Sequence, residues 1–221
     1  MLNTYLTDTA LILDDPSNLY YSTATLTNFI NRARRWISVR CFFPQVLVTG
    51  LQTVGAQEAY DLSLANTEAT ATPGVASVYG LLMISTQQAN YFPALGRDDF
   101  AAYMADWKIL TGTLQNYPYK FATLGRGSNA KIYMGPVPAA VYDMWWLVQC
   151  LPINLASDSD VEAIPDPWGD IVAWKAASIA NASQQRWADM QALDQTVDTL
   201  MMEASRAEMP FVRPTWYPNP G

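Results

Sequence analysis

The residue types that carry most enzyme chemistry are sparse in this chain. It has no histidine and only two cysteines, Cys41 and Cys150, among its 221 residues. Without histidine, a Ser-His or Cys-His nucleophile pair cannot form. Two cysteines alone also leave a tetrahedral zinc ion short of its usual ligands. We therefore expect no catalytic triad, no metal or cofactor site, and two buried, reduced thiols.

Two short segments are similar to parts of known binding loops. Gly125-Arg126-Gly127-Ser128 resembles a fragment of a phosphate-binding loop, but the Walker spacing and its Lys-Ser/Thr pair are absent. Asp158-Ser159-Asp160-Val161-Glu162 resembles the start of a calcium loop, but the sixth position is Ala163 and the twelfth is Gly169. We interpret the first segment as a tight turn between strands and the second as a solvated acidic loop.

The composition favours binding to proteins over binding to nucleic acid. Half of the residues are apolar, 15% are charged, and the chain contains eight Trp and twelve Tyr. Tyr and Trp are favoured at interfaces because they bury a large area at low entropic cost, although an aromatic-rich core explains any single one. The net charge of −7 opposes extended binding along a phosphate backbone. An acidic protein can still border a DNA path, because repulsion keeps the duplex from adhering.

Neither a signal peptide nor a membrane span is expected. The first residues lack a charged segment followed by an apolar stretch. No apolar run reaches the length that crosses a bilayer, since the run Tyr142–Leu151 is long enough only for a strand. We expect a soluble protein that is made in a cytoplasm.

The N-terminal part predicts two helices, over residues 2–13 and from Ser22 or Thr23 to Cys41, with a turn between them. The second helix has a buried stripe at three-and-four spacing. Its members are Leu26, Phe29, Ile30, Ala33, Ile37 and Cys41. The same helix carries four arginines and no acidic residue: Arg32 and Arg35 on the far side, Arg34 towards the flank of the stripe, and Arg40. A solvated face explains them; the alternative is contact with an acidic partner or with DNA phosphates.

The sequence from Val46 to about Cys150 changes to short extended runs. Five runs rich in β-branched and aromatic residues predict strands. They are Val46–Thr49, Val75–Ile84, Phe121–Leu124, Lys131–Met134 and Tyr142–Cys150. One helix is expected among them, over Asp98–Leu110, because its apolar residues share a face and two aspartates stand at its N-terminal end.

The C-terminal part predicts two further helices and an extended tail. Pro165 or Pro167 suits the first turn of one helix, and a second apolar pattern covers Gln184 to about Ala207. The second helix must pack in a bundle, since burying its six large side chains yields roughly 10–15 kcal/mol, less than the cost of ordering it. The segment Met209–Gly221 contains four prolines and three aromatic residues. We interpret it as a docking tail; the alternative is a disordered terminus.

These patterns predict an α+β fold. Residues 1–45 and 153–208 supply the helices of one bundle, and residues 46–152 form a β-rich insertion that contains one helix. Residues 209–221 form an extended docking tail.

Two groups of residues, taken in order, resemble a known family. The first is Tyr21-Ser22 followed by Leu26, Ile30-Asn31 and Ala33-Arg34 on one helix, after a short helix and an Asp-containing turn. The second is Tyr142–Pro152, an acidic loop, Ile164-Pro165-Asp166-Pro167-Trp168, an Ala-rich helix to Ala177, and a last helix from Gln184 to Ala204. Together they resemble the head-to-tail adaptor (connector) proteins of tailed bacteriophages, notably those of short-tailed phages. The likeness covers roughly the first 45 and the last 80 residues.

The resemblance implies a virion structural protein without enzyme activity. It implies a homo-oligomeric ring, commonly of twelve copies, under the portal at the head-tail junction, assembled in the host cytoplasm. The helices form the ring wall, the β-rich insertion extends towards tail or nozzle proteins or around a neighbour, and double-stranded DNA passes without sequence specificity. The tail would dock into the portal protein through Phe211, Arg213, Trp216 and Tyr217. Arg32, Arg34 and Arg35 would contact an acidic partner or the passing DNA.

Two other functions stay open at this stage. A tail-tube terminator or another minor tail protein would differ in its partner, the tail tube instead of the portal. A cell-wall glycosidase would use two carboxylates of the central region, because such pairs need no fixed spacing in sequence.

Overall fold

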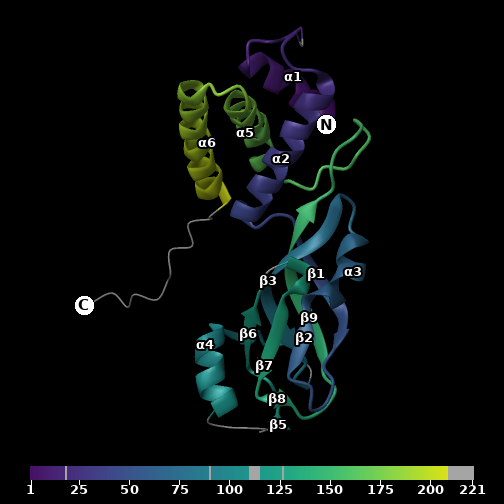
Figure 1. Ribbon diagram of the computed structural model, residues 1–221. Helices are drawn as coiled ribbons and strands as arrows, with labels where there is room; N and C mark the ends of the chain where they lie inside the picture. Colours follow the sequence, from purple (N-terminus) through teal and green to yellow (C-terminus); the bar gives the residue numbers. More distant parts are fainter. Residues whose placement is uncertain (18, 90, 110–114, 126, 209–221) are drawn as a thin grey trace, which may run out of the picture. The chain divides into compact units, whose positions relative to one another are not determined.

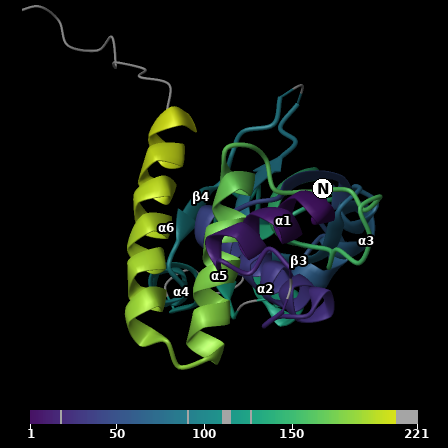
Figure 2. The ribbon, with the colours of Figure 1, turned by 90° about the horizontal axis from the view of Figure 1, so that it is seen from above.

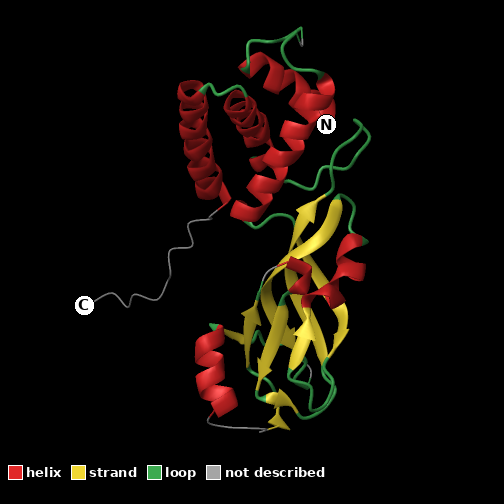
Figure 3. Cartoon of the chain, in the orientation of Figure 1, coloured by secondary structure: helices red, strands yellow, loops and turns green. Residues whose placement is uncertain are grey.

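The chain has an α+β fold, as predicted, in a computed structural model that describes residues 1–17, 19–89, 91–109, 115–125 and 127–208 (Figures 1 and 3). It divides into two compact units. We call residues 1–34, 155–159 and those from 165 onward the helical unit, and residues 35–154 and 160–164 the β unit.

The helical unit is made from both ends of the sequence. Its elements are α1 (Leu2–Ile12), the first part of α2 (Thr23–Cys41), α5 (Trp168–Ser183) and α6 (Trp187–Glu208). These bounds agree with the predicted helices, except that α6 begins three residues later than Gln184. Gln185 has a positive φ of 60°, so the backbone turns there before α6 begins. None of the described helices is both long and apolar enough to cross a membrane.

The two C-terminal helices lie side by side (Figure 2). The alanines Ala173, Ala176, Ala177 and Ala180 of α5 are all buried, and their small side chains permit close packing. Asp194 of α6 joins the two helices: Lys175 Nζ lies 2.8 Å from its Oδ1, and the hydroxyl of Ser178 donates to the same atom at 2.5 Å.

Polar contacts tie the N-terminal helices to the C-terminal part of the helical unit. The side-chain amide of Asn31 forms two hydrogen bonds with the backbone of Leu155, donating to its carbonyl oxygen (2.9 Å) and accepting from its N–H (2.8 Å). The hydroxyl of Tyr21 donates to the carbonyl oxygen of Ala180 at 3.3 Å. Both residues belong to the group on which the family resemblance rests, and here they join segments more than 120 residues apart in sequence.

The turn that follows α1 is organised by one carboxylate. Asp15 is buried and accepts hydrogen bonds from the backbone N–H groups of Leu19, Tyr20 and Tyr21, at 2.7–3.1 Å. Burial opposes ionisation of this carboxyl, but the three donors outweigh it and lower its pKa. The turn therefore fixes the path of the chain into α2.

The described residues of the β unit form three small sheets. A three-stranded antiparallel sheet has the order β1–β9–β3, a four-stranded mixed sheet has the order β2–β7–β6–β4, and β5 pairs with β8. The strands are β1 (Gln45–Gln52), β2 (Ala59–Asp61), β3 (Val75–Thr86), β4 (Gly96–Asp98), β5 (Gln115–Asn116), β6 (Lys120–Leu124), β7 (Lys131–Gly135), β8 (Val137–Pro138) and β9 (Asp143–Pro152). Each of the five predicted strands is present. The short helix α3 (Asn66–Thr70) contacts β3 and β1.

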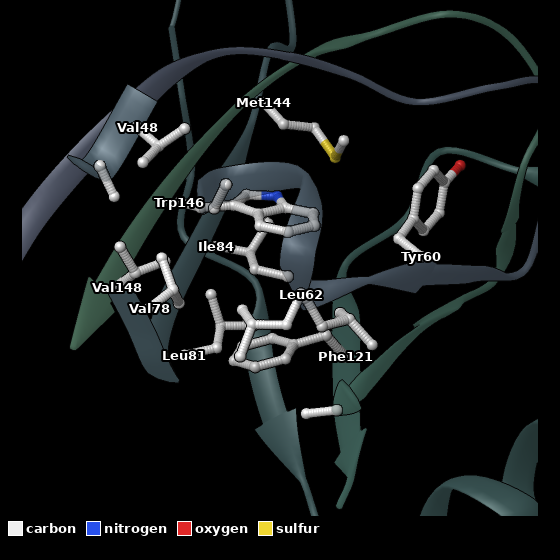
Figure 4. Close-up of a cluster of buried hydrophobic side chains, with 14 of the residues drawn as sticks. Val48, Tyr60, Leu62, Val78, Leu81, Ile84, Phe121, Met144, Trp146 and Val148 are labelled. Carbon is white, nitrogen blue, oxygen red and sulfur yellow. The ribbon is translucent and has the colours of Figure 1, made fainter. Parts of the chain in front are cut away.

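The core of the β unit is formed by side chains from both larger sheets (Figure 4). Trp146 of β9 is fully buried, together with Val48 of β1, Ile84 of β3 and Phe121 of β6. Buried and more exposed residues alternate along the first part of β9. Next to Ile84 and Phe121, however, Ser85 of β3 and Ala122 of β6 are also buried, so both faces of these strands are covered there.

The predicted helix over Asp98–Leu110 is irregular. Only α4 (Phe100–Tyr103) is α-helical, and a π-helical segment (Met104–Ile109) follows it. Asp99 caps α4 by accepting a hydrogen bond from the N–H of Ala102 at 2.7 Å. The prediction of helical structure was right, but its α-helical length was too long, because apolar spacing alone does not distinguish the two backbone geometries.

The stability that Glu68 contributes to the fold should depend on pH. Its carboxylate accepts hydrogen bonds from the N–H groups of Thr49 (2.8 Å) and Gly50 (3.0 Å), where β1 departs from regular pairing, and these bonds lower its pKa. A lowered pKa in the folded state adds stability above the ordinary pKa of 4.5 and loses it as the pH falls through the folded value. Glu68→Gln should therefore lower the free energy of unfolding by about 1–2 kcal/mol at neutral pH and by far less near pH 3. Denaturant titrations at both pH values measure this, and an equal loss at both would rule out the charge as the cause.

Candidate interaction surfaces

The described residues contain no cluster of three or more His, Cys, Asp and Glu side chains that could hold a metal ion. The two loop-like segments have structural roles. Gly125 and Gly127 have positive φ values in the connection between the antiparallel strands β6 and β7. The segment lies between strands as predicted, but the connection contains a 3-10 helix (Gly127–Asn129) and is longer than a tight turn. In the acidic loop, Asp158 accepts from the N–H of Asn3, and Glu162 accepts from the N–H groups of Ala163 and Ile164.

The arginines of α2 differ in their surroundings. Arg32 and Arg35 are exposed, as predicted. Arg34 is fully buried and donates to Oδ1 of Asn31 at 3.3 Å, so the prediction that it contacts an outside partner or DNA was wrong. Its position explains this result: Arg34 follows Ile30 by four residues and precedes Ile37 by three, which places it on the buried stripe of the helix. Arg40 lies over the ring of Trp36, with its guanidinium carbon 4.7 Å from the ring centre.

Much of the surface of α6 is open to solvent. Of its described side chains only Val197 and Ala204 are buried. Four large apolar side chains on the same side are half-buried: Met190, Leu193, Leu200 and Met201. Trp187 and Met202 are more than half exposed. A helix with this much accessible apolar area is typical of a surface that another chain covers.

A second apolar surface lies on the outer face of the three-stranded sheet. Leu47 of β1 and Met83 of β3 both pair with Leu147 of β9, and Trp145 stands two residues away on the same face. Leu47, Met83 and Trp145 are 46%, 36% and 37% exposed, and Phe92 stacks on Trp145 with ring centres 4.1 Å apart. This surface could not be predicted from the sequence, because its members come from three strands whose pairing no local pattern reveals.

The β unit also has a cavity of about 450 Å³ beside β3. Its lining includes Val39 and Phe42 from the end of α2 and the turn after it, Tyr79 and Leu81 of β3, and the cation of Arg97. Phe42 is half exposed there and has a positive φ of 61°. The lining combines polar and apolar groups but holds no acidic residue, so it offers no pair of acids for glycoside hydrolysis and does not favour the glycosidase alternative.

The predicted docking residues Phe211, Arg213, Trp216 and Tyr217 lie outside the described residues.

Cys41 and Cys150 do not form a disulfide, and their surroundings predict different reactivity. Cys150 is fully buried in β9, and burial raises its pKa to about 11, whereas Cys41 is only partly buried. A raised pKa lowers the fraction of reactive thiolate at neutral pH. We expect a maleimide to label native protein once, at Cys41, and to label Cys150 only after unfolding. Mass spectrometry measures this, and native Cys41→Ser should stay unlabelled; rapid labelling of that variant would contradict the buried position of Cys150.

No protein-family model matches the chain, and no curated protein matches it significantly.

Proposed function

We propose that this protein is a head-to-tail adaptor of a tailed bacteriophage, a ring-forming structural protein between the portal and the tail. One observation carries the proposal: both ends of the sequence build one helical unit whose last helix, α6, keeps a broad surface open to solvent. Such a helix needs a further partner to cover its apolar side chains. The order of the sequence groups around Tyr21 and Trp168, which resembles that of phage connector proteins, supports another subunit as that partner.

In this proposal the N- and C-terminal helices form a bundle in the ring wall. Asn31 and Tyr21 hold the two halves of that bundle together through Leu155 and Ala180. The β unit is the insertion that contacts tail or nozzle proteins or a neighbouring subunit. Its exposed apolar surface around Leu47 and Trp145 gives such a contact the apolar area that it needs.

The net negative charge fits a protein that borders DNA without binding it tightly. With 20 acidic and 13 basic residues, the chain repels a phosphate backbone overall. The passing duplex would then move along the channel without sequence-specific contacts.

Electron microscopy of the purified chain mixed with portal rings from the same source tests the proposal. We expect an added layer of density under the portal. Such adaptors need not form rings before they meet the portal, so a monomer in solution would not count against the role. Bare portals would overturn the proposal, and the tail tube would then be the next partner to test.

A further inference from the structure

The cavity beside β3, which we call the β3 cavity, contains a buried amide oxygen that accepts no hydrogen bond. Gln149 of β9 lines this cavity and is only 4% exposed. Its Nε2 donates to the backbone carbonyl oxygens of Ser38 (2.8 Å) and Val39 (3.4 Å) in α2. These two acceptors fix the orientation of the amide, because only its nitrogen can donate to them. Its Oε1 atom therefore points away from these carbonyls, and no described residue donates to it.

Gly80 keeps this oxygen accessible from β3. It pairs with Gln149 across the sheet and also lines the β3 cavity. The Oε1 atom of Gln149 lies 3.5 Å from the position that a Cβ atom at Gly80 would occupy. Because buried polar atoms in folded proteins are normally paired, an open acceptor at this place favours a ligand that donates an N–H or O–H group.

The β3 cavity also has one cation. Arg97 of β4 is exposed, and its guanidinium forms neither an ion pair nor a hydrogen bond with a described residue. It is the one charged residue of the cavity lining, all of which lies in the described part of the chain. A planar guanidinium binds a carboxylate through two parallel hydrogen bonds. Phosphate sites usually combine several backbone N–H groups or cations, so a single arginine favours a carboxylate.

Apolar side chains form another part of the lining. Leu62, Leu81 and Ile132 are each at most 5% exposed and come from three different segments of the β unit. Phe42 is half exposed beside them, with a backbone φ of 61° that bulky residues rarely adopt. Backbone strain of this kind is often found at binding sites. The β3 cavity therefore suits a ligand with an apolar group as well as an anion and a donor.

The position of the cavity at the edge of a sheet favours a polypeptide as the ligand. Four consecutive residues of β3, Tyr79–Leu82, line the cavity. β3 is the last strand in the order β1–β9–β3, so no described strand pairs with its outer edge along these residues. An extended chain can add to such an edge through backbone hydrogen bonds. The last residue of a chain combines an N–H group, a side chain and a carboxylate, which match the three kinds of group in the cavity.

We propose that the β3 cavity binds the C-terminus of another polypeptide, one that ends in a large apolar residue. The terminal carboxylate pairs with Arg97, and the N–H group of the last residue donates to Oε1 of Gln149. Its side chain packs against Phe42 and Leu81, and the residues before it extend along β3. The whole site belongs to the β unit, and the inference goes beyond the proposed function, because it holds whether or not the protein is an adaptor.

Peptides with defined C-terminal chemistry test the site on the full-length protein. The probes are acetyl-Ala-Ala-Phe and acetyl-Ala-Ala-Leu with free carboxylates. A C-terminal amide removes the charge, and N-methylation of the last residue removes the N–H group. We expect each altered peptide to bind on the order of 10-fold more weakly than the free acid, because it loses a hydrogen bond to a charged group or to a buried acceptor. Isothermal titration calorimetry measures these affinities.

Three variants locate the binding. Arg97→Gln should abolish the preference for the free acid and leave the affinity of the amidated peptide unchanged. Phe42→Asn should weaken all the peptides, since it removes the ring while asparagine tolerates the positive φ. Lys131→Gln is the matched control, because it removes an exposed cation of the β unit outside the cavity, and it should change each affinity by less than about twofold. Circular dichroism checks that each variant is folded.

The outcomes decide both the site and the source of the ligand. A preference for the free acid that is lost in Arg97→Gln supports the site. No binding of either free acid overturns it, as does a preference that persists in Arg97→Gln. Equal affinities of N-acetylphenylalanine and the tripeptide would show that β3 adds no contact, and would reject a polypeptide in favour of a small molecule. Portal binding is measured separately and bears only on the proposed function.

Discussion

Replacing Asn31 with alanine should lower the free energy of unfolding by roughly 2–6 kcal/mol. The variant loses both hydrogen bonds to the backbone of Leu155 and the bond that Arg34 donates to it. The N–H and carbonyl groups of Leu155, which is itself buried, then lose their side-chain partner. An unpaired buried polar group costs about 1–3 kcal/mol, and this substitution leaves two of them.

Urea denaturation followed by circular dichroism measures the effect. Asn28→Ala is the matched control, since it removes the same side chain from an exposed position of the same helix. It should change stability by no more than about 0.5 kcal/mol. Equal stabilities of the two variants would show that the contact between Asn31 and Leu155 does not hold the helical unit together.

The helices could be predicted well because their apolar spacing is local. The stripe from Leu26 to Ile37 was predicted, and those residues are buried. The burial of Arg34 on the same stripe was not predicted, because arginine is rarely buried and its charge favours the surface. Its partner Asn31 lies next to the apolar stripe but bonds to a residue 124 positions away, which no local pattern reveals.

In the β unit, the strands could be predicted from the sequence, but their pairing could not. Each strand is marked by a run of β-branched and aromatic residues, yet the pairing of Gln45 with Gln149 joins residues about a hundred positions apart. The strand order β1–β9–β3 decides which side chains meet on the outer face, and register shifts along β3 change the alternation. The exposed surface around Trp145 therefore depends on the pairing, and only the fold reveals it.

Substitutions in the tail, residues 209–221, should have the second large effect, a loss of binding to the portal. Trp216→Ala/Tyr217→Ala should weaken binding to the portal by at least about 30-fold, the change that corresponds to the loss of a hot-spot residue, because large aromatic anchors carry most of the binding energy in an interface. Phe211→Ala should weaken it in the same direction, and Arg213→Ala should do so most strongly at low salt, where exposed charges act over longer distances. Removal of residues 209–221 should abolish binding altogether.

The folded units provide the internal check for this prediction. All described helices end at or before Glu208, so the helical signal in circular dichroism should stay the same in every tail variant. Thr215→Ala/Asn219→Ala alters two polar tail residues and should leave portal binding within about twofold of the unaltered chain, as expected for positions outside the anchors. Portal binding that survives removal of the tail would place the portal contact on the helical or β unit, with the open face of α6 and the surface around Trp145 as the next positions to substitute.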